Sequence, residues 1–177
     1  MGVVVAGAVL SAIFTGVALA SSRRTCTTRI TPEIVRLAKK WARVRGIPVE
    51  WILATISLES GGKSCLVGDQ GRSLGLMQVN TVAHAGLIKE MSLTKSSMYL
   101  PNTNIAVGSH ILRERWELVH AATGGVSPVP MGTLVALAYW GPGPTIGAIR
   151  AGTDPRHQNP RRVERWDAAL KETSPLV

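Results

Sequence analysis

The chain has 177 residues, of which 45% are hydrophobic, and its 20 Lys and Arg outnumber its 11 Asp and Glu, giving a formal net charge of +9. This length suits one domain with a packed core, and the charge favours an anionic partner such as nucleic acid, a membrane surface or a cell-wall polymer. The sequence contains no phosphate-binding glycine loop, aromatic RNA-binding motif or zinc-finger spacing. We therefore expect neither a specific nucleic-acid partner nor a metal site.

The first 22 residues carry no charged side chain, and Arg23 and Arg24 follow them directly. At about 1.5 Å per residue, an apolar helix of this length just spans a bilayer. Three interpretations remain open: an export signal with Ala18-Leu19-Ala20 as its cleavage site, a retained membrane helix, and a hydrophobic anchor in an assembled particle or secretion channel. Residues 1–22 are thus predicted as a signal or membrane-anchor segment, through which the protein contacts a membrane.

Residues 23–30 are polar and basic and are predicted as a linker, followed by a single domain over residues 31–177. Thr31-Pro32-Glu33 predicts the first helix, because it supplies a capping side chain, a proline at the first helical position and an acid in the first turn. Gly46 is the expected end of this helix.

Glu59 continues an apolar face of the second predicted helix. This helix starts at Pro48, and Ile52, Ile56 and Glu59 follow one another at helical spacing. Burial beside apolar side chains raises the pKa of a carboxyl group, because desolvation penalises its charged form. Glu59 is therefore a candidate general acid at near-neutral pH.

The remaining helices are predicted from their periodicity and from Pro and Gly at their boundaries. They are a short helix over residues 81–85, a long helix from Asn102, a nearly uncharged helix over residues 131–140, a short helix over residues 145–150 and a final helix from Asn159-Pro160. Alternating patterns typical of strands are essentially absent. The sequence therefore predicts an all-α fold.

The only two cysteines, Cys26 and Cys65, are 39 positions apart and form no Cys-x-x-Cys pair. Structural zinc and thioredoxin-like chemistry are therefore not expected. Two alternatives remain: two unconnected thiols, or a disulfide that ties the segment before the first helix to the loop after Glu59. The disulfide would require an oxidising compartment.

Four motifs follow one another along the chain: Glu59-Ser60, Ser73-Leu74-Gly75-Leu76-Met77-Gln78-Val79-Asn80, Asn104-Ile105-Ala106-Val107-Gly108 and Ala138-Tyr139. In this order and spacing, over roughly residues 34–143, the chain resembles the soluble lytic transglycosylase (SLT) family. The second motif is most similar to the small transglycosylases of phage particles and of conjugation and secretion systems. The resemblance implies an all-α, lysozyme-like domain.

The resemblance also implies an enzyme, a lyase that cleaves peptidoglycan without a cofactor. Such enzymes cut the β-1,4 bond between N-acetylmuramic acid and N-acetylglucosamine and leave a 1,6-anhydromuramic end. One carboxyl group acts first as acid and then as base, and on the matching positions it is that of Glu59. The implied substrate-binding residues are Ser73 and Gln78 for the sugar's N-acetyl and hydroxyl groups, Met77 as a lining of the cleft, Tyr139 as a contact of Glu59 or the substrate, and Asn80.

One position departs from the family pattern, in which Asn follows Ala-Tyr. Here Trp140 follows Tyr139, and it is expected either to stack on a sugar ring or to pack in the core. Two other functions remain open: a lysozyme-type hydrolase in which Asp69 positions a water molecule, and a structural component of a virion or secretion channel that binds the wall.

The expected role of the transglycosylase is local opening of the wall, for phage genome entry or for secretion assembly. We expect the protein in the cell envelope or periplasm, exported or anchored in a membrane, or carried in a phage virion. Its expected partners, besides peptidoglycan, are virion or secretion-complex proteins.

Overall fold

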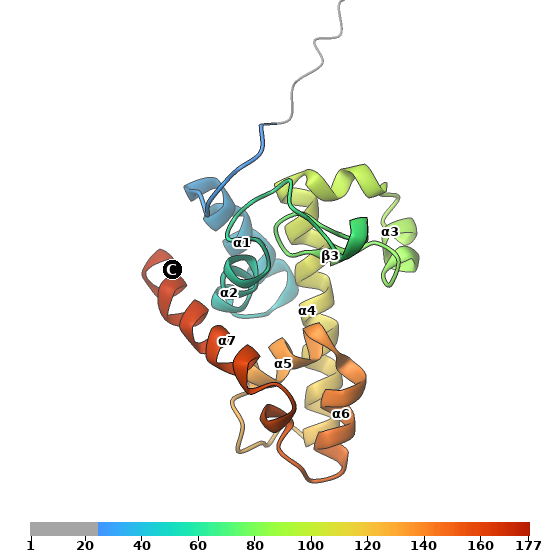
Figure 1. Cartoon of the computed structure of the whole chain (residues 1–177), viewed down its shortest axis with the longest axis vertical. Helices are drawn as coiled ribbons and strands as arrows, with labels where there is room; N and C mark the ends of the chain where they lie inside the picture. Colours follow the sequence, from blue (N-terminus) through green and yellow to red (C-terminus); the bar gives the residue numbers. More distant parts are fainter. Residues whose placement is uncertain (1–24) are drawn as a thin grey trace, which may run out of the picture.

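The computed structural model describes residues 25–177 (Figure 1), so the apolar segment predicted over residues 1–22 lies outside the described residues. Between residues 25 and 177, no helix is both long and apolar enough to cross a bilayer. This part of the chain forms α1 (Pro32–Arg45), α2 (Val49–Ser60), β1 (Val67–Gly68), β2 (Ser73–Leu74), β3 (Val79–Asn80), α3 (Ala85–Glu90), α4 (Pro101–Thr123), α5 (Met131–Trp140), α6 (Pro142–Arg150) and α7 (Pro160–Thr173). The prediction of an all-α, lysozyme-like domain is confirmed.

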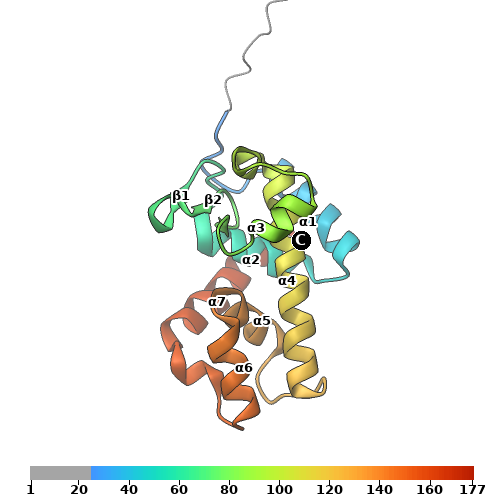
Figure 2. The same cartoon turned by 90° about the vertical axis from the view of Figure 1, so that its right-hand side faces the viewer.

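The helices form two groups along α4, the longest helix of the described part. Figures 1 and 2 show α1, α2, the strands and α3 around one end of α4, and α5, α6 and α7 around the other. Two helices join the groups, because α2 packs closely along α7 and α4 contacts both α1 and α5. The end of α2 therefore lies where the two groups meet.

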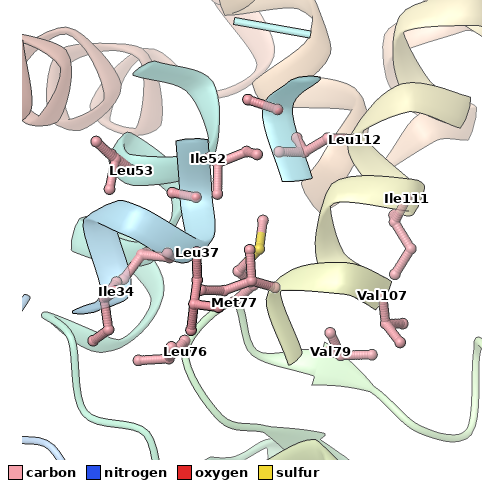
Figure 3. Packing of buried hydrophobic residues seen from close by; sticks show 14 of the residues in the cluster. Ile34, Leu37, Ile52, Leu53, Leu76, Met77, Val79, Val107, Ile111 and Leu112 are labelled. Atoms are coloured by element: carbon pink, nitrogen blue, oxygen red, sulfur yellow. The ribbon is translucent and has the colours of Figure 1, made fainter. Parts of the chain in front are cut away.

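The main hydrophobic core lies between α1, α2, α4 and the turn that links β2 to β3 (Figure 3). Its fully or almost fully buried side chains include Ile34, Leu37, Ile52, Leu53, Leu76, Met77, Val79, Val107, Ile111 and Leu112. Burying one side chain of this size contributes about 1.5–3 kcal/mol. A smaller cluster of Ala54, Ala136, Trp166 and Ala169 fixes α7 against α2 and α5.

The start of α1 and the ends of α1 and α2 follow from local chemistry. The Thr31 hydroxyl accepts a hydrogen bond from the Ile34 N–H (3.3 Å), and Gly46 ends α1 in the left-handed conformation, with φ of 63°. Gly61 ends α2 in the same way, with φ of 59°. These caps satisfy backbone groups that a helix end leaves without partners, and they fix how far α2 extends beyond its apolar face.

The segment before α1, predicted as a linker, is held against the loop that follows α2. Cys26 and Cys65 form a disulfide, with their Cα atoms 5.5 Å apart. The Thr27 hydroxyl donates to the Gly62 carbonyl oxygen (2.6 Å), and the Thr27 N–H donates to the Ser64 hydroxyl (3.0 Å). Residues 26–30 thus pack as part of the domain and hold the loop after Glu59 in place.

We expect the variant with Cys26→Ser and Cys65→Ser to unfold with a free energy about 3–4 kcal/mol lower than the wild type, because the disulfide closes a loop of 39 residues. Urea unfolding measures this difference. Reductant should lower the wild-type midpoint to that of the variant and leave the variant's midpoint unchanged. Equal midpoints for the oxidised wild type and the variant would contradict the expectation.

Three details of the fold differ from the predictions. β1, β2 and β3 form a small antiparallel sheet, and strands of two residues are too short to show an alternating pattern. The helix expected over residues 81–85 starts at Ala85 instead, because the Asn80 side-chain oxygen accepts from the N–H groups of Val82 and Ala83 and holds a turn. α6 starts at Pro142 rather than Thr145, since proline suits the first helical position.

Candidate active site

A pocket of about 530 Å³ lies where the two groups of helices meet, at the end of α2. Its wall on the sheet side comes from the segment between β1 and α3, and its opposite wall comes from α5, α6 and α7. The lining residues with polar or aromatic side chains are Glu59, Asp69, Ser73, Gln78, Asn80, His84, Arg115, Tyr139, Trp140, Arg162 and Arg165. The pocket thus combines carboxylates, amides and arginines with two aromatic rings.

Glu59, in the last turn of α2, carries the carboxyl group with the clearest chemical role. Burial raises the pKa of Glu59, and the Trp140 hydrogen bond and the charges of Arg162 and Arg165 oppose that rise without cancelling it. The raised pKa keeps a larger share of this carboxyl group protonated as the pH approaches neutrality. This shift of the Glu59 pKa is in the direction that a general acid requires.

Trp140, the last residue of α5, donates its indole Nε1–H to Glu59 Oε1 over 2.5 Å. Its ring packs against the cluster that holds α7, and the Arg162 guanidinium lies 5.0 Å from the ring centroid. The Trp140 ring therefore packs in the core, as one of its two expected roles requires, and its indole N–H has a separate role. This N–H fixes Oε1 of Glu59, which leaves Oε2 for proton transfer.

Ser73 and Gln78 line the sheet side of the pocket. The Ser73 hydroxyl donates to Asp69 Oδ2 over 2.5 Å. The Gln78 amide nitrogen donates to the carbonyl oxygens of Leu66 (3.2 Å) and Gly75 (2.9 Å). With both of its N–H bonds so used, the Gln78 side chain is held in one orientation, and its Oε1 is the atom left to accept from a bound molecule.

The model of the transglycosylase SLT domain matches residues 36–149, which is more than half of the chain and includes the pocket residues from Glu59 to Trp140. The chain belongs to the SLT transglycosylase family. Members of this family are lytic transglycosylases that act on peptidoglycan, so peptidoglycan is the substrate that membership implies. No curated protein matches the chain.

Met77 does not line the transglycosylase pocket, so its predicted contact with substrate is wrong. Its side chain is 0% exposed and lies at the centre of the core (Figure 3), where its sulfur occupies the space that a Cβ on Gly108 would need. A residue without accessible surface has no atoms to offer a sugar. Its backbone matters instead, because the Met77 carbonyl oxygen accepts from the Tyr139 hydroxyl over 2.8 Å.

Asn104, on α4, supports the turn that links β2 to β3, a role that the sequence motif did not specify. Its Nδ2 donates to the carbonyl oxygens of Leu74 (2.8 Å) and Met98 (2.9 Å), and its Oδ1 accepts from the Met77 N–H (2.8 Å). Gly75, with φ of 77°, lies so close to this amide that a Cβ would overlap it. One buried amide thereby fixes the turn that presents Gln78 to the pocket.

We expect Asn104→Leu to lower the free energy of unfolding by at least about 3 kcal/mol, because three buried backbone groups lose their partner at about 1–3 kcal/mol each. Urea unfolding followed by circular dichroism measures the loss. Ser109→Ala is the matched control: it removes a buried hydroxyl of the same helix that bonds only locally, to the Ala106 carbonyl oxygen, and should cost about 1 kcal/mol. A loss for Asn104→Leu no larger than that of the control would refute the assigned role.

Tyr139 and Asn80 both line the pocket, and both are already engaged in hydrogen bonds. The Tyr139 hydroxyl donates to Met77 rather than to Glu59, and burial together with the negative charge of Glu59 raises the pKa of Tyr139. Tyr139 is therefore neutral, with its oxygen left as an acceptor. Asn80 uses its Oδ1 to start the turn before α3, so its amide nitrogen is the atom available to a ligand.

Three pocket arginines were not predicted as site residues. Arg162 and Arg165 lie one turn apart on α7, and Arg115 lies on α4. The sequence shows that the first two share a helix face, but nothing in it indicates that this face closes a pocket around Glu59. The three cations outnumber the carboxylates of Glu59 and Asp69, so the pocket favours an anionic ligand.

Proposed function

We propose that this protein cleaves the β-1,4 bond between N-acetylmuramic acid and N-acetylglucosamine by lytic transglycosylation, with Glu59 as both acid and base. The observation that carries the proposal is the environment of Glu59: a carboxyl group with a raised pKa, half-buried in a pocket and held on one oxygen by Trp140. Membership of the SLT family supports the reaction class. No metal or organic cofactor is needed for this chemistry.

In the proposed reaction, Glu59 transfers its proton to the glycosidic oxygen as the bond from that oxygen to C1 of the muramic sugar breaks. The carbonyl oxygen of the sugar's own N-acetyl group bonds to C1 and carries the positive charge. The Glu59 carboxylate then removes the proton from the O6 hydroxyl, and O6 bonds to C1 as the N-acetyl oxygen leaves. The product is a 1,6-anhydro ring, Glu59 is protonated again, and no water is consumed.

A second candidate is hydrolysis, for which Asp69 is the relevant residue. Asp69 lines the same pocket, and its negative charge contributes to the raised pKa of Glu59. An inverting hydrolase uses such a second carboxylate to activate water. Against this role, Asp69 accepts a hydrogen bond from Ser73, which occupies one of its oxygens. We therefore favour transglycosylation, and the products distinguish the two reactions.

The test is digestion of purified peptidoglycan with the full-length protein and mass spectrometry of the released muropeptides. The wild type and Asp69→Asn should both release anhydromuramic ends, and Glu59→Gln should release them about 10³-fold to 10⁴-fold more slowly. Reducing ends from the wild type that disappear in Asp69→Asn would establish the hydrolase. Absence of any product from the wild type would favour a structural wall-binding protein.

We also propose that the enzyme opens the wall locally, during phage genome entry or during assembly of a secretion system, and that residues 1–22 engage a membrane. The supporting observations are the Ser73–Asn80 motif, the uncharged first 22 residues and the Cys26–Cys65 bond, which forms in oxidising compartments. Fractionation of producing cells and of virions, with N-terminal sequencing, tests this. An uncleaved chain in membranes or virions is the expected result, and a cytosolic protein with reduced cysteines would overturn it.

A further inference from the structure

Arg115, on α4, is the third arginine that lines the pocket. The charges of Arg162 and Arg165 lower the pKa of Glu59, whereas Arg115 is not among the groups that shift this pKa. Its side chain is only 15% exposed, and its Nε is buried without a hydrogen-bond partner within the described part of the chain. The carboxylate paired with it is that of Glu114, 3.9 Å away and 44% exposed. Arg115 is thus an enclosed cation whose hydrogen-bonding capacity is incompletely used.

Within residues 25–177, Glu114 is the one carboxylate that forms an ion pair with Arg115. Glu114 is shared with His110, whose Nε2 lies 3.6 Å from its other oxygen. His84 lines the pocket beside Arg115, and burial, followed by the charge of Arg115, lowers the pKa of His84, so that this imidazole is neutral at pH 7. An enclosed cation with so weak a partner is costly unless a ligand completes it.

Arg115 also lies within reach of the reaction centre. The charges of Glu59 and of Arg115 both act on the buried Tyr139 hydroxyl, with opposite effects on its pKa. All three side chains line the same pocket. A glycan bound with its scissile bond at Glu59 therefore occupies a pocket to whose wall Arg115 contributes.

We propose that Arg115, with His84 beside it on the pocket wall, binds a carboxylate of the glycan substrate. This inference rests on the proposed function. A planar guanidinium donates two parallel hydrogen bonds to the oxygens of a carboxylate, and a neutral imidazole adds one N–H donor. The sugar rings themselves carry no charge, so the carboxylate comes from one of two sources: the peptide stem, or the lactyl group of muramic acid, which is free where the stem has been removed.

The experiment uses full-length protein and three preparations of uncrosslinked glycan strands: strands with intact stems, strands stripped of stems by an amidase, and stem-bearing strands whose carboxylates have been converted to amides. Wild type, Arg115→Gln and Arg115→Lys are compared by steady-state kinetics. Arg161→Gln, which removes an exposed charge of α7 outside the pocket, is the matched control and should behave as the wild type.

We expect Arg115→Gln to raise KM about 10-fold to 100-fold on carboxylate-bearing strands with little change in kcat, with partial rescue by Arg115→Lys. On amidated strands, wild type and variant should be equal. A loss confined to stem-bearing strands identifies the stem carboxylates, and a loss on stripped strands identifies the lactyl group. Equal effects of Arg115→Gln on charged and amidated strands, or a fall in kcat alone, would overturn the proposal.

Two further measurements keep the test decisive. If Arg115→Gln does not fold, amidation of the strands must still raise the KM of the wild type, and an unchanged KM refutes the subsite. Binding is also measured by calorimetry in Glu59→Gln, with and without Arg115→Gln. Weaker binding of charged strands after loss of Arg115 supports the carboxylate subsite even if no product ever forms. The binding measurement thus tests the subsite separately from the proposed reaction.

Discussion

Replacing Glu59 with Gln should lower the rate of glycan cleavage by about 10³-fold to 10⁴-fold, because one carboxyl group performs both proton transfers. The amide keeps the shape of the side chain and an oxygen that accepts from Trp140, so the pocket stays formed. Quantification of anhydromuramic products over time measures the loss. Activity within 10-fold of the wild type would show that another residue supplies the proton.

The same substitution should raise the melting temperature at pH 7. Burial raises the folded-state pKa of Glu59 above its ordinary value of 4.5, so the folded protein binds this proton more tightly than the unfolded chain. Stability then falls as the pH rises from about 4.5 through the folded-state pKa and stays lower above it. Glu59→Gln removes that loss, and its advantage over the wild type should shrink below pH 4.5.

Glu50→Gln is the matched control for this stability effect, since Glu50 lies in the first turn of α2, where a negative charge is favourable. It should give no rise in melting temperature at pH 7. A Glu59→Gln protein that melts at or below the wild-type temperature at pH 7 would show that the buried carboxylate does not destabilise the fold.

Trp140→Phe should lower kcat/KM about 10-fold to 100-fold, because Glu59 loses the hydrogen bond that fixes one of its oxygens. It should also shift the pH profile. The indole N–H lowers the pKa of Glu59, so its removal raises that pKa further and keeps the acid protonated to higher pH. The alkaline limb of kcat/KM should therefore move to higher pH.

Trp116→Phe is the control for the general effect of replacing a tryptophan. Trp116 packs at the edge of the main core on α4, outside the pocket, and should leave the pH profile unchanged. A Trp140→Phe enzyme that loses rate with an unshifted alkaline limb would indicate that the ring acts only by packing. A shift toward lower pH would contradict the sign of the electrostatic argument.

Much of the helical framework could be predicted because its signals are local. Thr31-Pro32-Glu33 starts α1 through its own side chains, and Gly46 ends it through its own backbone. The helix over residues 131–140 was predicted with the bounds that α5 has, since its apolar run ends where Gly141 and Pro142 follow. The placement of Glu59 at the end of an apolar face likewise depends on spacing within one helix.

The pocket could be predicted only in part, because several of its contacts join distant segments. Trp140 meets Glu59 across 81 positions, and no local pattern indicates that pair. Met77 was expected to face the substrate, because a motif gives the order of its residues without showing which of them the turn directs inward. The three short strands could not be predicted either, because a strand of two residues is too short to show the alternation of apolar and polar residues that indicates a strand.

The hydrogen bonds of Asn104 have a consequence for how the enzyme meets its substrate. The turn that carries Gln78 is joined to α4 by a buried amide and to α5 by the Tyr139 hydroxyl, so it cannot shift without exposing core groups. On the opposite wall, the exposed Arg162 lies over the Trp140 ring, and the exposed Arg165 donates to the Leu58 carbonyl oxygen over 3.5 Å. A glycan entering the pocket thus meets a turn whose backbone is held by two different helices, and a bound sugar has to fit the one orientation in which that turn presents Gln78.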